Sequence, residues 1–119
     1  MYSDRLLDHF RNPRHTGELP APSVCVEVSN PACGDVLRLS VRIEGGRVAE
    51  ARFKAHGCTA SIAAGSVVTE LIAGKSLDEL TRLAPADIEQ ALDGLPPTSK
   101  HAAALAVDAV RALAASWPG

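Results

Sequence analysis

The sequence of 119 residues has few aromatic side chains: Phe, Tyr and Trp make up 3% of it, whereas hydrophobic residues make up 46%. Its core must therefore be built from Val, Leu, Ile and many Ala, which suit close packing of helices. No apolar run approaches the roughly 20 residues of a membrane span, and the amphipathic start has no apolar signal-peptide core. We therefore expect a cytoplasmic protein without a membrane partner.

The sequence also has no excess of positive charge, because it contains 12 Lys and Arg but 14 Asp and Glu, which gives a net charge of -2. Proteins that bind duplexes need a basic surface, so nucleic acid is not an expected partner. The length suits one compact domain and is too short to suggest two. Residues 1–119 are thus expected to form a single domain.

Cysteine is scarce as well, and the three present are Cys25, Cys33 and Cys58. An odd number without signal-peptide context argues against a disulfide framework. The thiols are therefore expected to be reduced, and to be buried, catalytic or metal-binding.

Helix signals stand at the start of the chain and in its second half. Ser3 can cap a first helix, which Asn12-Pro13 ends because a residue before proline avoids the helical region. Glycine, serine and proline mark the ends of the later helices. These are expected at about 60–73, 76–83, 85–92 and 99–116, the last with an inward stripe of Ala102, Leu105, Ala109, Leu113 and Trp117.

Strand signals lie between the first helix and the others. Apolar and polar residues alternate over 24–29 and 36–43, and a third strand is expected over 48–56 after a hairpin turn at Gly45-Gly46. Strands in the first half and helices in the second indicate an α+β fold. We expect a three-stranded antiparallel sheet packed against helices on one face.

Four residues at the ends of these elements could bind a metal. Cys33 and Asp35 flank Gly34 in a turn between strands, Cys58 precedes a helix whose positive end favours thiolate, and His101 begins the last helix. Two Cys, one Asp and one His suit Zn²⁺ or Fe²⁺, or a [2Fe–2S] cluster with non-thiolate ligands on one side. Spacing does not show that they converge, and inert buried thiols with a helix-end histidine would explain the same residues.

Motifs along almost the entire chain resemble those of the IscU/NifU N-terminal family. Their shared order is far more specific than any single motif. The matching segments are Tyr2-Ser3, Asp8-His9-Phe10, Asn12-Pro13-Arg14, Pro31-Ala32-Cys33-Gly34-Asp35, Ala51-Arg52-Phe53-Lys54, Gly57-Cys58, Ser61-Ile62-Ala63, Val68-Thr69-Glu70, Gly74-Lys75-Ser76-Leu77-Asp78-Glu79 and Leu95-Pro96-Pro97 before His101.

The resemblance implies a SufE/IscU-like fold over residues 1–119 and a scaffold for iron–sulfur cluster assembly. Such a scaffold receives sulfur from a cysteine desulfurase, receives iron, builds a [2Fe–2S] cluster and passes it to apo-proteins; it is not a turnover enzyme. Cys33, Asp35, Cys58 and His101 match the cluster or metal ligands of that family. Tyr2 matches a tyrosine implicated in its dimerisation.

The sequence departs from that family at Ala102, where a cysteine normally follows the site histidine. That cysteine is a ligand and commonly the first persulfide acceptor, so its absence puts sulfur transfer in doubt. An alternative is a divergent protein that holds Zn²⁺ or Fe²⁺ and binds assembly partners without building clusters. A persulfide relay through Cys58, as in SufU-like relatives, ranks last because those relatives use the missing cysteine and carry an insertion that is absent here.

Other residues are expected to stay outside the site. Cys25 alternates with its valine neighbours toward the opposite face of its strand, which favours a structural or surface role. His9 and His15 are expected in solvated or helix-end roles, and His56 is a less favoured ligand beside Gly57. Leu95-Pro96-Pro97 matches the start of an Hsp70-binding segment, but Thr98 and Ser99 replace its Val-Lys pair, which argues against specific Hsp70 recognition.

Overall fold

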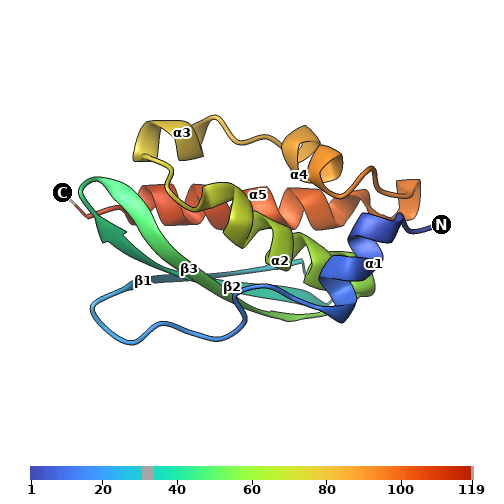
Figure 1. The fold of residues 1–119 in the computed structure, drawn as a ribbon, viewed down its shortest axis with the longest axis horizontal. Helices are drawn as coiled ribbons and strands as arrows, with labels where there is room; N and C mark the ends of the chain where they lie inside the picture. The colour runs from blue at the N-terminus through green and yellow to red at the C-terminus, as the bar shows by residue number, and fades with distance from the viewer. Residues whose placement is uncertain (31–33, 119) are drawn as a thin grey trace.

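The structure, a computed structural model, describes residues 1–30 and 34–118, and its elements follow the predicted order (Figure 1). Every expected helix and strand is present, with ends within two residues of those predicted. The strands are β1 (Val24–Asn30), β2 (Asp35–Glu44) and β3 (Arg47–His56). The helices are α1 (Asp4–Arg11), α2 (Thr59–Ile72), α3 (Leu77–Thr81), α4 (Pro85–Ala91) and α5 (Lys100–Ala115), with a 3₁₀ turn over Pro97–Ser99.

The sheet is antiparallel, with the strand order β1-β2-β3. Gly45 and Gly46 have φ angles of 59° and 72°, the left-handed conformation that a tight hairpin turn requires. Asp35 pairs with Asn30, and Val36 pairs with His56. This register places the start of β2 and the end of β3 at the same end of the sheet.

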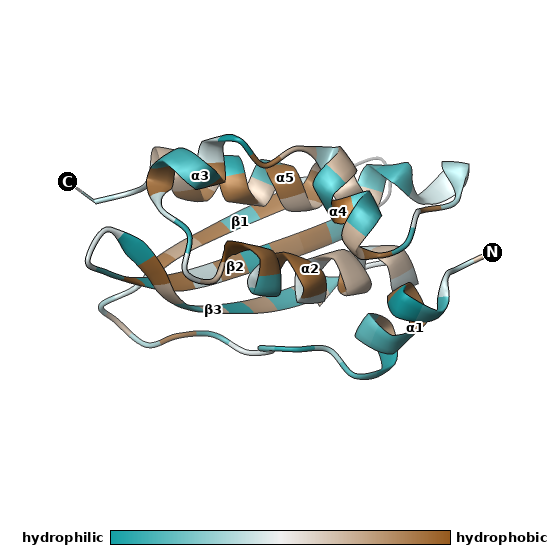
Figure 2. Cartoon of the chain, turned by 45° about the horizontal axis from the view of Figure 1, so that its top comes forward, coloured by the Kyte–Doolittle hydropathy of each residue, from teal (hydrophilic) through white to brown (hydrophobic). Residues whose placement is uncertain are grey.

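Helices cover one face of the sheet, where α2 packs against β3 and α5 packs against β1 and β2. The sides of these elements that face one another are largely hydrophobic (Figure 2). Helices α3 and α4 pack on α5, and α1 packs on α2 at the end of the molecule where α5 begins (Figure 1). The arrangement brings the first residues of α2 and α5 to the end of the sheet where β2 starts.

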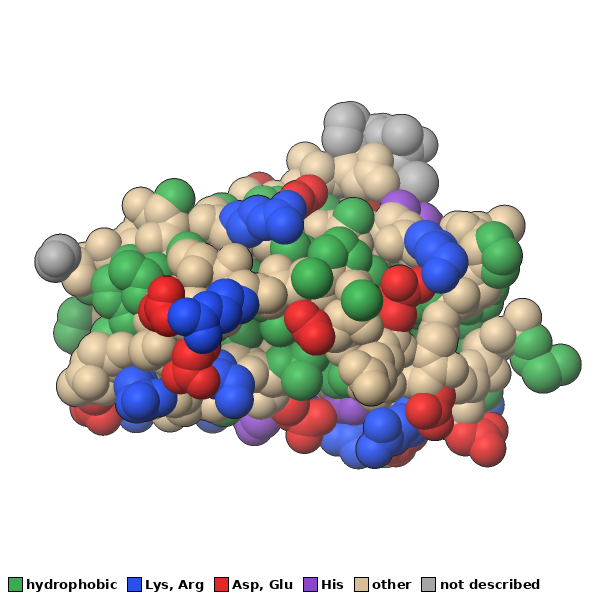
Figure 3. All heavy atoms as spheres, turned by 90° about the horizontal axis from the view of Figure 1, so that it is seen from above, with side chains coloured by type: hydrophobic (Ala, Val, Ile, Leu, Met, Phe, Trp, Pro, Cys, Tyr) green, Lys and Arg blue, Asp and Glu red, His purple; other side chains and the backbone are tan. Residues whose placement is uncertain are grey.

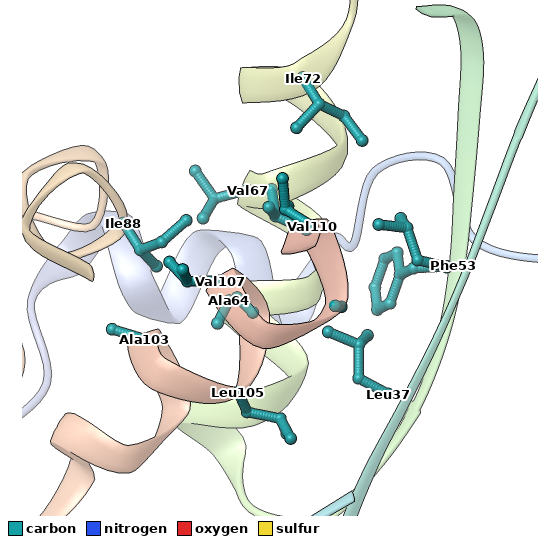
Figure 4. Close-up of a cluster of buried hydrophobic side chains, with 14 of the residues drawn as sticks. Leu37, Phe53, Ala64, Val67, Ile72, Ile88, Ala103, Leu105, Val107 and Val110 are labelled. Atoms are coloured by element: carbon teal, nitrogen blue, oxygen red, sulfur yellow. The ribbon is translucent and has the colours of Figure 1, made fainter. Parts of the chain in front are cut away.

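The core between sheet and helices depends on small residues. Phe53 and Leu37 point from the sheet toward α2 and α5 (Figure 4). A Cβ on Gly65 of α2 would lie 2.6 Å from a ring carbon of Phe53, so only glycine allows the helix to come this close. The predicted inward stripe of α5 is confirmed: Ala102, Leu105, Ala109 and Leu113 are buried, and Trp117 is partly buried against the core.

The connector after α1 covers part of the free edge of β3. Gly17 N donates to Phe53 O at 2.9 Å, and Phe53 N donates to His15 O at the same distance. Further along, Val48 N donates to Lys75 O at 2.9 Å. These bonds use backbone groups that an open strand edge would leave unpaired.

The surface above α3, α4 and α5 carries charges of both signs side by side (Figure 3). Lys100 Nζ lies 2.6 Å from Glu89 Oε1, and Arg82 lies the same distance from Asp78 one helical turn away. In the described residues, no helix has both the length and the apolar character needed to cross a membrane.

His9 lies in the last turn of α1, as its expected helix-end role requires, but it is not solvated, because α1 lies against α2 and leaves the residue 8% exposed. His9 Nδ1 lies 2.7 Å from Ser66 Oγ, and Nε2 lies 3.4 Å from Glu70 Oε1. Burial, with a smaller effect from the nearby Arg14, lowers the pKa of His9 below its ordinary value. The neutral imidazole therefore helps to hold α1 on α2.

His9 makes the stability of the fold sensitive to acid. Since its pKa is lower in the folded chain than in the unfolded one, the unfolded chain takes up this proton before the folded chain does as the pH falls below about 6.5. We expect the free energy of unfolding to fall between about pH 7 and pH 5, and less steeply in His9→Asn. Denaturant unfolding at several pH values in this range measures the slope of the unfolding free energy against pH. His56→Asn, at an exposed histidine, is the control. Equal slopes in wild type and His9→Asn would contradict the prediction.

Candidate metal centre

Asp35, Cys58 and His101 meet at the end of the sheet and form a group that could hold a metal ion. Asp35 is the first residue of β2, Cys58 is the N-cap of α2 just after β3, and His101 is the second residue of α5. Each position follows from the register of the sheet and from the packing of the two helices on it. Residues far apart in sequence are thereby brought to one point.

The distances among the three donor atoms suit a single ion. His101 Nε2 lies 3.1 Å from Asp35 Oδ2 and 3.6 Å from Cys58 Sγ, and this sulfur lies 3.9 Å from the same carboxylate oxygen. A tetrahedral ion with ligand bonds of about 2.0 to 2.3 Å separates its ligands by about 3.3 to 3.8 Å. The donor set of thiolate, imidazole and carboxylate therefore fits Zn²⁺ or Fe²⁺ with little rearrangement.

Burial differs across the site. The Asp35 side chain is 2% exposed, whereas that of His101 is 27% exposed and Cys58 is partly buried. The carboxylate thus forms the inner wall, and the sulfur and imidazole lie toward solvent. An ion or cluster bound here would be accessible from one side.

The buried carboxylate of Asp35 is satisfied by several donors. Cys58 N donates to Asp35 Oδ1 at 3.2 Å, at the N-terminus of α2, where the helix dipole favours negative charge. Ser61 Oγ donates to Asp35 Oδ2 at 2.7 Å. These bonds offset the cost of burying the group and fix its orientation.

Gly57 allows this close approach of β2 and the start of α2. Its φ angle is +148°, and a Cβ at this position would lie 2.7 Å from Asp35 Cγ and closer still to Oδ1. Any larger residue would therefore displace the carboxylate.

The structure brings together three of the four predicted ligands, and the fourth, Cys33, lies outside the described residues. Ala102, next to His101, is fully buried in the core. His56 is exposed and is not a member of the group of three. Cys25 is exposed, as its predicted surface role requires, and its sulfur lies 3.8 Å from Arg38 Nη2.

Ser61 is a site residue that the sequence reasoning missed, although it belongs to a matching motif. It lies three residues after Cys58 in the first turn of α2, so a helix starting at Thr59 places both residues on neighbouring positions of one face. That spacing was the signal that could have found it.

The full length of the chain, residues 1–119, matches the sequence profile of the family described as the NifU-like N terminal domain. The chain is 41% identical over 120 residues to the iron–sulfur cluster assembly scaffold protein IscU of Escherichia coli K12, covering 98% of this chain and 93% of that protein. It is 37% identical over 111 residues to IscU 1 of Archaeoglobus fulgidus, covering 93% of this chain and 72% of that protein. The chain therefore belongs to the NifU-like N-terminal domain family, as its motifs predicted.

Another relative is much longer. The bifunctional protein NifU/MnmA of Rubrobacter xylanophilus is 44% identical over 119 residues, which cover 98% of this chain but 24% of that protein. The chain thus spans about a quarter of this relative.

Solved structures share the fold. A protein described as a putative iron–sulfur cluster assembly scaffold of the SUF system from Fervidobacterium islandicum matches with a TM-score of 0.79 at 22% identity, covering 93% of this chain and 94% of the other. A NifU-like N-terminal protein from Brucella abortus matches with a TM-score of 0.65 at 22% identity, covering 92% and 77%. The predicted α+β fold with a three-stranded antiparallel sheet is confirmed.

Substitution of Gly57 tests the role of Asp35 as a ligand. Gly57→Ala should push the Asp35 carboxylate out of place and weaken Zn²⁺ binding by about tenfold or more, measured by competition with a chromophoric chelator. Gly74→Ala is the matched control, because φ is also positive there (+77°) but no atom lies within 4 Å of the added Cβ. Equal Zn²⁺ affinity in the two variants would show that Asp35 does not bind the ion.

Proposed function

We propose that this protein is a scaffold on which [2Fe–2S] clusters are assembled and from which they are transferred. Cys33, Asp35, Cys58 and His101 are the proposed ligands, and the cluster is the cargo of the protein. The observation that carries the proposal is the convergence of thiol, carboxyl and imidazole groups at one partly open end of the sheet.

The chemistry of the site suits a cargo that must be released. Thiolate sulfur is the common ligand of iron–sulfur clusters, while imidazole and carboxylate ligands replace thiolates on one side of some sites. Here Cys58 and His101 lie toward solvent, so an acceptor protein can reach the iron that they bind. The buried Asp35 holds the inner side during assembly.

The names of the relatives support the same class of function. The Escherichia coli and Archaeoglobus fulgidus relatives are named assembly scaffold proteins, whereas a Drosophila melanogaster relative, 40% identical over 121 residues, is named an assembly enzyme. We propose a scaffold without turnover chemistry of its own, with a cysteine desulfurase as sulfur donor and apo-proteins as acceptors. Specific Hsp70 recognition is not part of the proposal, because the sequence departs from the Hsp70 segment at Thr98 and Ser99, and Ser99 is buried.

A second candidate function rests on Ala102. This side chain has no donor atom, so it can neither bind iron nor accept sulfur. A protein with this substitution could hold one Zn²⁺ or Fe²⁺ through the same residues and bind assembly partners without building clusters. A persulfide relay through Cys58 ranks below both, since the cysteine that relays sulfur in SufU-like proteins is the missing one.

Cluster formation tests the proposed site directly. Anaerobic reconstitution with iron, cysteine and a desulfurase should give the visible absorption of a [2Fe–2S] cluster in the wild type. Cys58→Ala should lose most of it, because a thiolate ligand is removed. Cys25→Ala, which removes an exposed thiol outside the site, should keep the wild-type spectrum. An unchanged spectrum in Cys58→Ala would refute the site assignment, and one tightly held zinc without any cluster in the wild type would favour the second candidate.

Restoring the missing thiol separates sulfur supply from cluster binding. In Ala102→Cys we expect more cluster when the desulfurase supplies sulfur, and unchanged loading when free sulfide is supplied, because four ligands are already present. The added sulfur enters a fully buried position, so stability should fall by about 1 to 3 kcal/mol. Quantitation of iron and sulfide measures the cluster content with either source of sulfur. A sharp increase in cluster content of Ala102→Cys with free sulfide would mean that the four native ligands do not suffice to bind the cluster.

A further inference from the structure

We infer that Ser61 is a positioning residue of the metal centre, whose hydroxyl donates a hydrogen bond to the Asp35 carboxylate or, when it turns, to the Cys58 sulfur. The inference rests on the proposed function in one respect, because it takes Asp35 and Cys58 as ligands. It adds a residue that neither coordinates the ion nor belongs to the ligand set.

The geometry points to Ser61 because it contacts two candidate ligands at once. Its side chain is in the first turn of α2 and is 1% exposed. Ser61 Oγ lies 2.7 Å from Asp35 Oδ2 and 3.3 Å from Cys58 Sγ. A buried hydroxyl needs a partner, and here both neighbouring acceptors are groups that bind the ion when ionised.

Binding of an ion would break one hydrogen-bonding contact of Asp35 and leave the others in place. His101 Nε2 lies 3.1 Å from Asp35 Oδ2, but this nitrogen can coordinate an ion only when it carries no proton to donate. The contact with His101 is therefore given up when the site fills. The hydrogen bonds from Cys58 N and Ser61 Oγ face no such conflict, so these two donors remain to orient the carboxylate.

The single hydroxyl proton of Ser61 can also point to sulfur. If it turns from Asp35 toward the Cys58 thiolate, the result is again a hydrogen bond to a charged acceptor, which is stronger than one between neutral groups. Either orientation keeps a ligand in the position that the ion requires. Loss of the hydroxyl should therefore affect the bound ion in addition to the stability of α2.

Ser66 provides a matched control on the same helix. It is also fully buried, it accepts a hydrogen bond from Arg14 N at 2.9 Å, and it lies 2.7 Å from His9 Nδ1. It belongs to the contact between α1 and α2. Ser66→Ala and Ser61→Ala thus each delete a buried, hydrogen-bonded hydroxyl from α2, and only Ser61→Ala deletes one next to candidate ligands.

The test uses Co²⁺ as a spectroscopic probe of the full-length chain in wild type, Ser61→Ala and Ser66→Ala. Thermal unfolding of the ion-free proteins first establishes that each variant is folded. We expect Ser61→Ala to bind Co²⁺ about 10- to 100-fold more weakly and to shift the thiolate-to-cobalt absorption band. Ser66→Ala should keep the affinity and the band of the wild type, although its unfolding temperature falls.

A double-mutant cycle that combines Ser61→Ala with Asp35→Asn gives a second measurement, which does not rely on Ser61→Ala alone. If Ser61 acts by holding the Asp35 carboxylate, the effect of Ser61→Ala on Co²⁺ affinity should shrink markedly in the Asp35→Asn background. Wild-type affinity and band in Ser61→Ala, or equal weakening in Ser66→Ala, would overturn the inference and leave the proposed function intact. Absence of Co²⁺ binding in the wild type would also overturn the inference, since there would be no ion for Ser61 to help hold, whereas the proposed function fails only if the reconstitution experiment gives no cluster.

Discussion

The buried carboxylate of Asp35 is the constraint on which the rest of the site depends. A carboxyl group that is 2% exposed is tolerated only when it has hydrogen-bond partners, and here the backbone of Cys58 and the hydroxyl of Ser61 supply them from the start of α2. The same bonds tie the first residue of β2 to the N-terminus of α2. Gly57 is required at this junction, since a side chain there would occupy the space of the carboxylate. One ionisable group therefore joins sheet, helix and site.

The close packing of small residues supports this junction from a distance. Gly65 lets α2 rest on the ring of Phe53, and the alanines of α5 let the second helix approach in the same way. With few aromatic residues available, the core relies on close approach of backbones rather than on large side chains. The first turns of both helices lie at the end of the sheet where β2 starts, and there Cys58 and His101 form with Asp35 a group that could hold a metal ion. Packing in the core thus determines the geometry of the centre.

Ala102 stands where related proteins carry a cysteine with two roles, as a ligand and as a sulfur acceptor. In the family that the motifs resemble, the cysteine at this position binds the cluster and commonly accepts sulfur, whereas the buried methyl group of Ala102 does neither. Without it, Asp35, Cys58 and His101 still form a group that could hold a metal ion. In the function that we propose, the alanine affects how the protein receives sulfur more than how it binds the cluster. The route by which sulfur enters the site is therefore the property that the substitution alters most.

Local signals in the sequence were sufficient for the elements of the fold. The cap at Ser3, the stop at Asn12-Pro13 and the glycine pair at Gly45-Gly46 each act within a few residues, and all three appear in the structure as predicted. The motifs also identified the family and the candidate ligands. Only the tertiary structure decided that Asp35, Cys58 and His101 meet, that Ser61 lies between two of them, and that His9 is buried against Ser66. Apart from the local spacing of Cys58 and Ser61, these facts arise from contacts between residues 23 to 66 positions apart. No local pattern encodes such contacts, because they depend on how whole helices pack on the sheet.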